Sequence, residues 1–214
     1  MSFTTPIEME SAFVENAELW LDASENHAFL VGCANGTVSE SQFNTWLVQD
    51  YMYVTSFHQF LSAIMQDAPV VDEEILKSGM VALNNELAWF QERARERGLD
   101  LCVSPLPTTI KYKEFMSTMA PCDYSLKIVA LYLIERVYQK AWSSVLVKGG
   151  ENGLYSKFAK NWGNKEFAGY VDELEIVANR ELKNSSIGAK NLQALFKEIM
   201  TLEVMFWDMA FEGV

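Results

Sequence analysis

The chain has 214 residues, of which 50% are hydrophobic and 21% are charged, and its formal net charge at pH 7 is −12. A half-apolar chain of this length can bury a sizeable core, which excludes intrinsic disorder. The acidic balance argues against nucleic acid as a partner, because phosphate binding needs clustered lysines and arginines. It also disfavours binding to an anionic membrane surface.

The sequence carries no pattern of export or of a membrane span. Its first residues lack the basic-then-apolar pattern of a signal peptide, and no uncharged apolar run approaches the roughly 20 residues that a spanning helix needs. The three cysteines are odd in number and show no CxxC spacing, which suits a reducing compartment. We therefore expect a cytoplasmic globular protein.

Apolar residues recur every three or four positions through most of the chain, which is the helical period. Ser39 with Gln42 three residues later is typical of a capping box at a helix start, and Gly98 predicts a helix end. No segment alternates long enough to predict a strand, and residues 99–103 are interpreted as a connector. The predicted helices, in chain order, span residues 7–34 with a break near Ser24, 39–66, 72–97, 108–120, 123–147, 152–161, 164–183 and 188–212.

No linker, low-complexity tract or internal repeat interrupts this helical pattern. We therefore predict one all-α domain over residues 1–214, a multi-helix bundle whose helices are apolar over wide faces. A two-stranded coiled coil would need a longer and stricter heptad repeat.

Three acidic residues, Asp50, Glu135 and Glu203, each interrupt an apolar stripe of a predicted helix. Burying an ionised carboxylate without a partner costs several kcal/mol. Three such residues are explained if their side chains meet in one polar pocket. Burial in such a pocket shifts the pKa values of the carboxyl groups, which suits acid–base catalysis. The alternative is that each acid is paired with a neighbouring side chain and is structural. The stripes are Trp46, Leu47, Asp50, Tyr53, Val54 and Phe57; Leu131, Ile134, Glu135, Tyr138 and Trp142; and Ile199, Leu202, Glu203, Phe206 and Ala210.

A fourth acid, Glu86, lies beside the stripe of its helix, where a solvated position and a place in the pocket are equally compatible with the spacing. The chain is also rich in aromatic residues near these acids. Most are expected in the core, but their faces could also stack on a small planar heterocycle. They are Tyr51, Tyr53, Tyr112, Tyr138, Trp162, Phe206 and Trp207.

Other chemistries lack their sequence signatures. A di-iron or di-manganese site in a helical bundle uses Glu-x-x-His pairs, but neither His27 nor His58 follows a glutamate at that spacing. Glycine-rich phosphate loops and the GxSxG motif are absent. Cys33 and Cys122 are interpreted as packed thiols. We therefore expect neither a metal nor a cofactor.

Three segments together resemble the TenA (thiaminase II) family in order and spacing, over nearly the whole chain. They are Phe43-x-x-Trp46-Leu47-Val48-Gln49-Asp50-Tyr51-x-Tyr53, Tyr155-x-x-Phe158-x-x-x-Trp162-Gly163-Asn164-x-x-Phe167, and Leu202-Glu203-Val204-Met205-Phe206-Trp207-x-Met209-Ala210. The resemblance implies a heme-oxygenase-like helical fold without heme, usually assembled as a homo-oligomer (a dimer or a tetramer). It also implies hydrolysis in the salvage of the thiamin pyrimidine.

The catalytic cysteine of the family aligns with Ala130, so this chain resembles the cysteine-less branch, as does its segment 83–90. That branch acts on the aminomethyl pyrimidine or its N-formyl derivative, towards 4-amino-5-hydroxymethyl-2-methylpyrimidine. By this resemblance Asp50 binds the ring nitrogen and the 4-amino group, Glu203 is catalytic, and Glu135 replaces the cysteine. The other substrate-binding candidates are Tyr53, Tyr112, Tyr138, Trp162, Glu86 and Phe206.

One of Glu203 and Glu135 is expected to activate water while the other protonates the leaving amine. The alternative to an enzyme is a non-catalytic pyrimidine-binding or regulatory protein of the same family.

Overall fold

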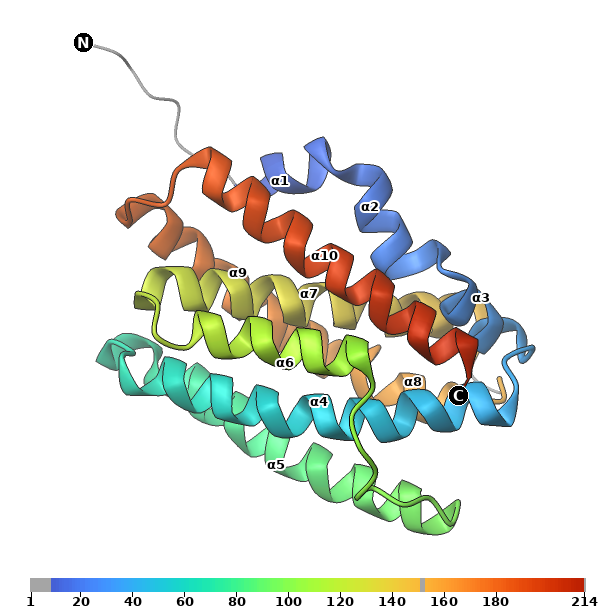
Figure 1. The fold of residues 1–214 in the computed structure, drawn as a ribbon. Coiled ribbons are helices and arrows are strands. Elements are labelled where there is room, and N and C mark those ends of the chain that lie inside the picture. The colour runs from blue at the N-terminus through green and yellow to red at the C-terminus, as the bar shows by residue number, and fades with distance from the viewer. Residues whose placement is uncertain (1–8, 151–152, 214) are drawn as a thin grey trace.

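Helices account for the regular structure of residues 9–150 and 153–213, which are the residues that the computed structural model describes (Figure 1). No β-strand occurs in this part of the chain, so the predicted all-α class is confirmed. In chain order the elements are α1 (Met9–Glu15), α2 (Ala17–Leu21), the π-helical turn η1 (Asp22–Asn26), α3 (Ala28–Asn35), α4 (Glu40–Gln66), the 3₁₀ turn η2 (Val70–Asp72), α5 (Glu73–Glu96), α6 (Pro107–Met119), α7 (Tyr124–Gly149), α8 (Ser156–Trp162), α9 (Lys165–Asn184) and α10 (Ala189–Glu212).

The helix ends follow local chemistry. Ser39 and Gln42 form the predicted capping box at the start of α4, with each side chain bonded to the backbone of the other residue. Gly98 follows α5 with φ of 65°, a left-handed conformation that favours glycine. The predicted break near Ser24 falls within the π turn, which separates α2 from α3. Positions 7, 8 and 152 of the predicted helices lie outside the described residues.

Two long helices organise the packing. Helix α7 contacts α3, α8, α9 and α10, and helix α4 contacts α5, α6 and α10. In Figure 1, α10 crosses the bundle and ends beside the start of α4. The largest side chains that are fully buried between these helices include Trp46, Trp142 and Trp207. None of the helices in the described part of the chain is long and apolar enough to cross a membrane.

An ion pair between a buried carboxylate and a partly exposed arginine joins the ends of three helices. Asp72, 1% exposed just before α5, receives two hydrogen bonds from the Arg180 guanidinium of α9, of which the one from Nη1 to Oδ1 is 2.9 Å long. The Tyr124 hydroxyl at the start of α7 donates a third bond, 2.7 Å long, to Oδ2 of Asp72. Because a buried carboxylate is stable only when its oxygens are paired, these contacts hold α5, α7 and α9 in fixed relative positions.

Candidate active site

The inner faces of α4, α5, α7, α8 and α9 enclose a cavity of about 40 Å³. Two of the acids, Glu86 from α5 and Glu135 from α7, lie in its wall, and no lysine or arginine is among the described residues that line it. The wall is therefore acidic and aromatic, without a counter-charge. Its residues are Tyr53, Val54, Phe57, Leu61, Gly79, Ala82, Leu83, Glu86, Ile134, Glu135, Tyr138, Trp162, Phe167 and Tyr170.

Asp50 lies directly behind one side of this wall. It is 1% exposed on α4, and the Tyr138 hydroxyl of α7 donates a hydrogen bond of 2.5 Å to its Oδ2 atom. Burial raises the pKa of Asp50 to about 7, and the bond from Tyr138 opposes that rise. Asp50 is therefore poised to change its protonation state near neutral pH.

Glu203 occupies a similar place on α10. It is 3% exposed, and the Tyr112 hydroxyl of α6 donates a hydrogen bond of 2.6 Å to its Oε1 atom. Burial raises the pKa of Glu203 to about 8; the bond from Tyr112 opposes this rise, and the charge of Asp50 adds to it. The centroid of the Tyr53 ring lies 4.7 Å from that of the Tyr112 ring. Tyr53 lines the cavity and therefore connects Tyr112 and Glu203 to it.

The two acids in the cavity wall differ in their partners. Trp162 donates a hydrogen bond of 3.0 Å from Nε1 to Oε1 of Glu86, whereas no described residue donates one to Glu135. Burial raises the pKa of Glu135 to about 8. Burial and the nearby charges of Asp50 and Glu135 raise the pKa of Glu86 well above its ordinary value. Both side chains therefore favour the neutral carboxylic acid when no cation lies beside them.

The structure brings four acids from four helices around Tyr53 and Tyr138. Burial raises the pKa of Tyr53, and the charges of Glu203, Glu135 and Asp50 raise it further. Asp50, Glu203, Tyr112 and Phe206 do not line the cavity themselves but form a layer behind its wall. The predicted candidates that line it are Tyr53, Glu86, Glu135, Tyr138 and Trp162.

Trp207 links the N-terminal helices to this site. Its indole Nε1 donates a hydrogen bond of 2.8 Å to the carbonyl oxygen of Ala23 in the π turn. The ring stacks on Phe29, with 5.8 Å between centroids, and on Tyr138, with 6.0 Å between centroids. The π turn therefore positions Trp207, which in turn orients the tyrosine that holds Asp50.

The variant Tyr138→Phe is expected to raise the pKa of Asp50 beyond about 7, because it removes the hydrogen bond that stabilises the carboxylate. The phenylalanine ring keeps the stacking on Trp207. The pH titration of the Asp50 carboxyl carbon by ¹³C NMR measures this change. In the control Tyr155→Phe, which removes a hydroxyl bonded to the Val38 carbonyl, the Asp50 titration should not move. An unshifted titration in Tyr138→Phe would contradict the role of this bond.

Sequence reasoning missed one polar residue of the cavity wall, Tyr170 of α9. Its hydroxyl is buried and has no hydrogen-bond partner among the described residues, which costs about 1–3 kcal/mol. A signal was present in the sequence, because Phe167, Tyr170, Val171 and Leu174 follow the helical period as an apolar stripe that carries one hydroxyl.

The position aligned with the family's cysteine does not lie in the wall. Ala130 is fully buried in the core, and from α7 the lining residues are Ile134, Glu135 and Tyr138. The chain's three cysteines are all within the described residues, and none of them lines the cavity. The side chains available for chemistry in this wall are therefore carboxyls and tyrosine hydroxyls.

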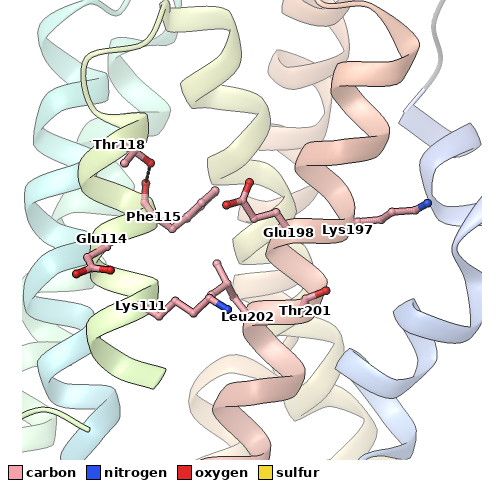
Figure 2. A pocket seen from close by; sticks show the side chains of 8 residues that line it. All are labelled: Lys111, Glu114, Phe115, Thr118, Lys197, Glu198, Thr201 and Leu202. Atoms are coloured by element: carbon pink, nitrogen blue, oxygen red, sulfur yellow. Dashed lines mark hydrogen bonds between the residues drawn. The ribbon is translucent and has the colours of Figure 1, made fainter. Parts of the chain in front are cut away.

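A larger hollow of about 510 Å³ lies between α6 and α10 and is open to solvent. Figure 2 shows Phe115 from α6 and Leu202 from α10 in the space between the two helices, with charged side chains around them. None of the four acids lines this groove.

Within the described residues, no three His, Cys, Asp or Glu side chains are grouped closely enough to hold a metal ion.

Two relatives align with nearly the whole chain. A protein of Glycine max described as a probable bifunctional TENA-E protein is 29% identical over 214 residues, which are 95% of this chain and 93% of that protein. An aminopyrimidine aminohydrolase of Halalkalibacterium halodurans is 25% identical over 94% of each chain.

Solved structures agree with the predicted heme-oxygenase-like fold. A TenA homologue from Pyrococcus furiosus has a TM-score of 0.87 and 27% identity, and the match covers 94% of this chain and 98% of that one. A Shewanella denitrificans domain described as having a heme oxygenase-like fold has a TM-score of 0.71 at 15% identity, over 97% and 94% of the two chains. The sequence profile of the TENA/THI-4/PQQC family matches residues 14–213, and the chain belongs to this family.

Proposed function

We propose that this protein is a hydrolase of thiamin pyrimidine salvage. Its substrate would be the aminomethyl pyrimidine or its N-formyl derivative, and its final product 4-amino-5-hydroxymethyl-2-methylpyrimidine. The observation that carries this proposal is the grouping of four buried acids at one small aromatic cavity: Glu86 and Glu135 lie in its wall, and Asp50 and Glu203 lie directly behind it. Membership of the family and the names of the relatives, TENA-E protein and aminopyrimidine aminohydrolase, support the same reaction.

The charge of the cavity selects among pyrimidines. Acids line it and surround it, whereas no lysine or arginine is among its described lining residues. A ligand that brings N–H donors satisfies these carboxyls, whereas a phosphate group would find no lysine or arginine among the described lining residues to pair with. The geometry therefore favours an unphosphorylated aminopyrimidine.

Asp50 is assigned to hold the pyrimidine by its ring nitrogen and 4-amino group. In this proposal the aromatic side chains Tyr53, Tyr138 and Trp162 enclose the ring. The space of about 40 Å³ is small against the roughly 300–1,000 Å³ of typical ligand pockets. We therefore expect lining side chains to move outward when the pyrimidine binds.

The two glutamates take different roles because their partners differ. The bond from Tyr112 stabilises the carboxylate of Glu203, which suits a general base, whereas Glu135 has no such donor and suits a general acid. Glu203 takes a proton from the water that attacks the C5 methylene carbon. The C–N bond breaks with its electron pair on nitrogen, and Glu135 supplies the proton to the leaving amine. The products are the hydroxymethyl pyrimidine and ammonia.

Incubation of the purified protein with the aminomethyl pyrimidine, and separately with its N-formyl derivative, tests the proposal. Product analysis by mass spectrometry should reveal the hydroxymethyl pyrimidine with release of ammonia from the first compound. Formate and the free amine are expected as first products from the second. Saturable binding of both compounds without turnover would identify a non-catalytic pyrimidine-binding protein instead.

We further propose that the chain acts as a single domain over residues 1–214, in a homo-oligomer located in the cytoplasm. Sedimentation velocity of the purified protein distinguishes a monomer from a dimer or a tetramer.

A further inference from the structure

The Tyr170 hydroxyl is a buried polar group that lines the cavity without a partner. No residue that the structure describes forms a hydrogen bond with it. Phe167, one turn earlier on α9, stacks against the Tyr170 ring with 6.0 Å between centroids, which holds the ring in place. Buried phenol hydroxyls ordinarily find a partner, because an unpaired one costs free energy. This hydroxyl therefore points to a ligand atom as its partner.

Gly79 of α5 provides the space for that hydroxyl. A Cβ atom at this position would lie 2.3 Å from the Tyr170 oxygen and 3.0 Å from its Cζ atom. Gly79 lies inside α5 and is not among the glycines with positive φ, so its backbone conformation does not require glycine. Glycine is also a poorer helix former than alanine. Close approach of the tyrosine hydroxyl thus accounts for this glycine.

Tyr170 and Glu135 line the same cavity from helices α9 and α7, which pack against each other, whereas Asp50 lies behind the wall. Among the acids, Glu135 is the one whose charge adds to burial in raising the pKa of Tyr170. Asp50 and Glu203, in contrast, act together with Glu135 on Tyr53. If Asp50 holds the ring, the Tyr170 hydroxyl is placed to reach the substituent on the exocyclic nitrogen rather than the ring itself.

We propose that the Tyr170 hydroxyl donates a hydrogen bond to the acyl oxygen of an N-acylated aminomethyl pyrimidine and so sets the preference for this substrate over the free amine. The inference rests on the proposed function and adds a residue that determines specificity. A formamide oxygen only accepts hydrogen bonds, so it needs a donor such as this hydroxyl. The free amine has no acyl oxygen to accept this bond, and its partner in the proposed mechanism is Glu135, which supplies the proton to the leaving nitrogen.

The same hydrogen bond assists the hydrolysis of the formamide. Water adds to the formyl carbon and the electron pair of the C=O bond moves onto oxygen, where Tyr170 donates its hydrogen bond. The C–N bond then breaks as the C=O bond re-forms, nitrogen takes up the proton that the attacking water gives up, and formate and the free amine leave. A donor aimed at the oxygen that gains charge lowers the barrier of this step.

The variant Tyr170→Phe tests this assignment. The ratio of kcat/KM for the N-formyl compound to kcat/KM for the free amine is expected to fall about tenfold or more, as on loss of an oxyanion donor. Its Tm without ligand should equal or exceed that of the wild type, because the variant keeps the ring and removes an unpaired hydroxyl. A merely structural hydroxyl would instead lower the Tm and leave the ratio unchanged, which would overturn the inference.

Two further variants separate the hydroxyl from general effects. Tyr51→Phe removes a hydroxyl that accepts a 3.3 Å hydrogen bond from Gln91 on the exposed side of the molecule, and it should keep the wild-type ratio. Gly79→Ala displaces the Tyr170 hydroxyl and should lower the ratio in the same direction. Combined with Tyr170→Phe it should lower the ratio no further, because both changes act through one group. An additive loss of the ratio would contradict the inference.

Failure of the inference is distinguishable from failure of the proposed function. Turnover of both compounds by the wild type, with an unchanged ratio in Tyr170→Phe, overturns the inference and leaves the function standing. If the wild type turns over neither compound, the function fails, and calorimetric titration with the N-formyl compound decides the inference. Binding that is about tenfold weaker in Tyr170→Phe supports the hydrogen bond, and equal binding overturns it.

Discussion

Glu203→Gln is expected to lower kcat for the aminomethyl pyrimidine by about 10²–10⁴-fold, because the amide cannot take a proton from water. Glutamine keeps the size of the side chain and can still accept the hydrogen bond that Tyr112 donates. The fold and the affinity for the ring should therefore be retained. The pH dependence of kcat/KM, measured by product formation, should lose its acidic limb, since that limb reports protonation of the base.

A matched substitution on the same helix controls for effects on α10. Glu198→Gln changes an exposed glutamate that lines the surface groove between α6 and α10, and it should leave kcat at the wild-type value. Retained activity of Glu203→Gln with an intact acidic limb would remove Glu203 from the proposed mechanism.

Glu135→Gln is expected to make the protein more stable than the wild type at pH 8, while the two are similar near pH 5. Burial raises the pKa of Glu135 to about 8, above its value in the unfolded chain. A raised pKa contributes stability that is complete below the unfolded pKa and is lost as the pH rises through the folded one. Glutamine does not ionise, so the variant avoids this loss, which we expect to be on the order of 4 kcal/mol at pH 8.

Urea unfolding followed by circular dichroism at pH 5 and pH 8 measures the two free energies of unfolding. Glu173→Gln, at an exposed position of α9, serves as the control and should shift the free energy equally at both pH values. Glu135→Gln should also remove the basic limb of the pH–rate profile, because Glu135 is the proposed acid. A variant that is less stable than the wild type at pH 8 would contradict the burial of an uncompensated carboxyl.

The helices and the faces of the acids were predictable from local information. The capping box of Ser39 and Gln42 and the period of three and four located α4 and the side on which Asp50 lies. The same period predicts the buried side for Glu203 on α10. These features depend on residues within two or three turns of one helix, which is the range over which sequence spacing determines geometry.

The assembly of the site depended on the tertiary structure. The spacing of Glu86 is compatible with a solvated position and with a place in the pocket. The packing of α5 against α4 and α9 places it in the cavity wall, where Trp162 donates a hydrogen bond to it. The helical period places Tyr170 on an apolar stripe of α9, but only the packing of α9 against α5 brings its hydroxyl against Gly79. A helical period tells which side of a helix is buried but not which distant helix it meets. Contacts between residues far apart in the sequence therefore decide which buried polar groups share one cavity.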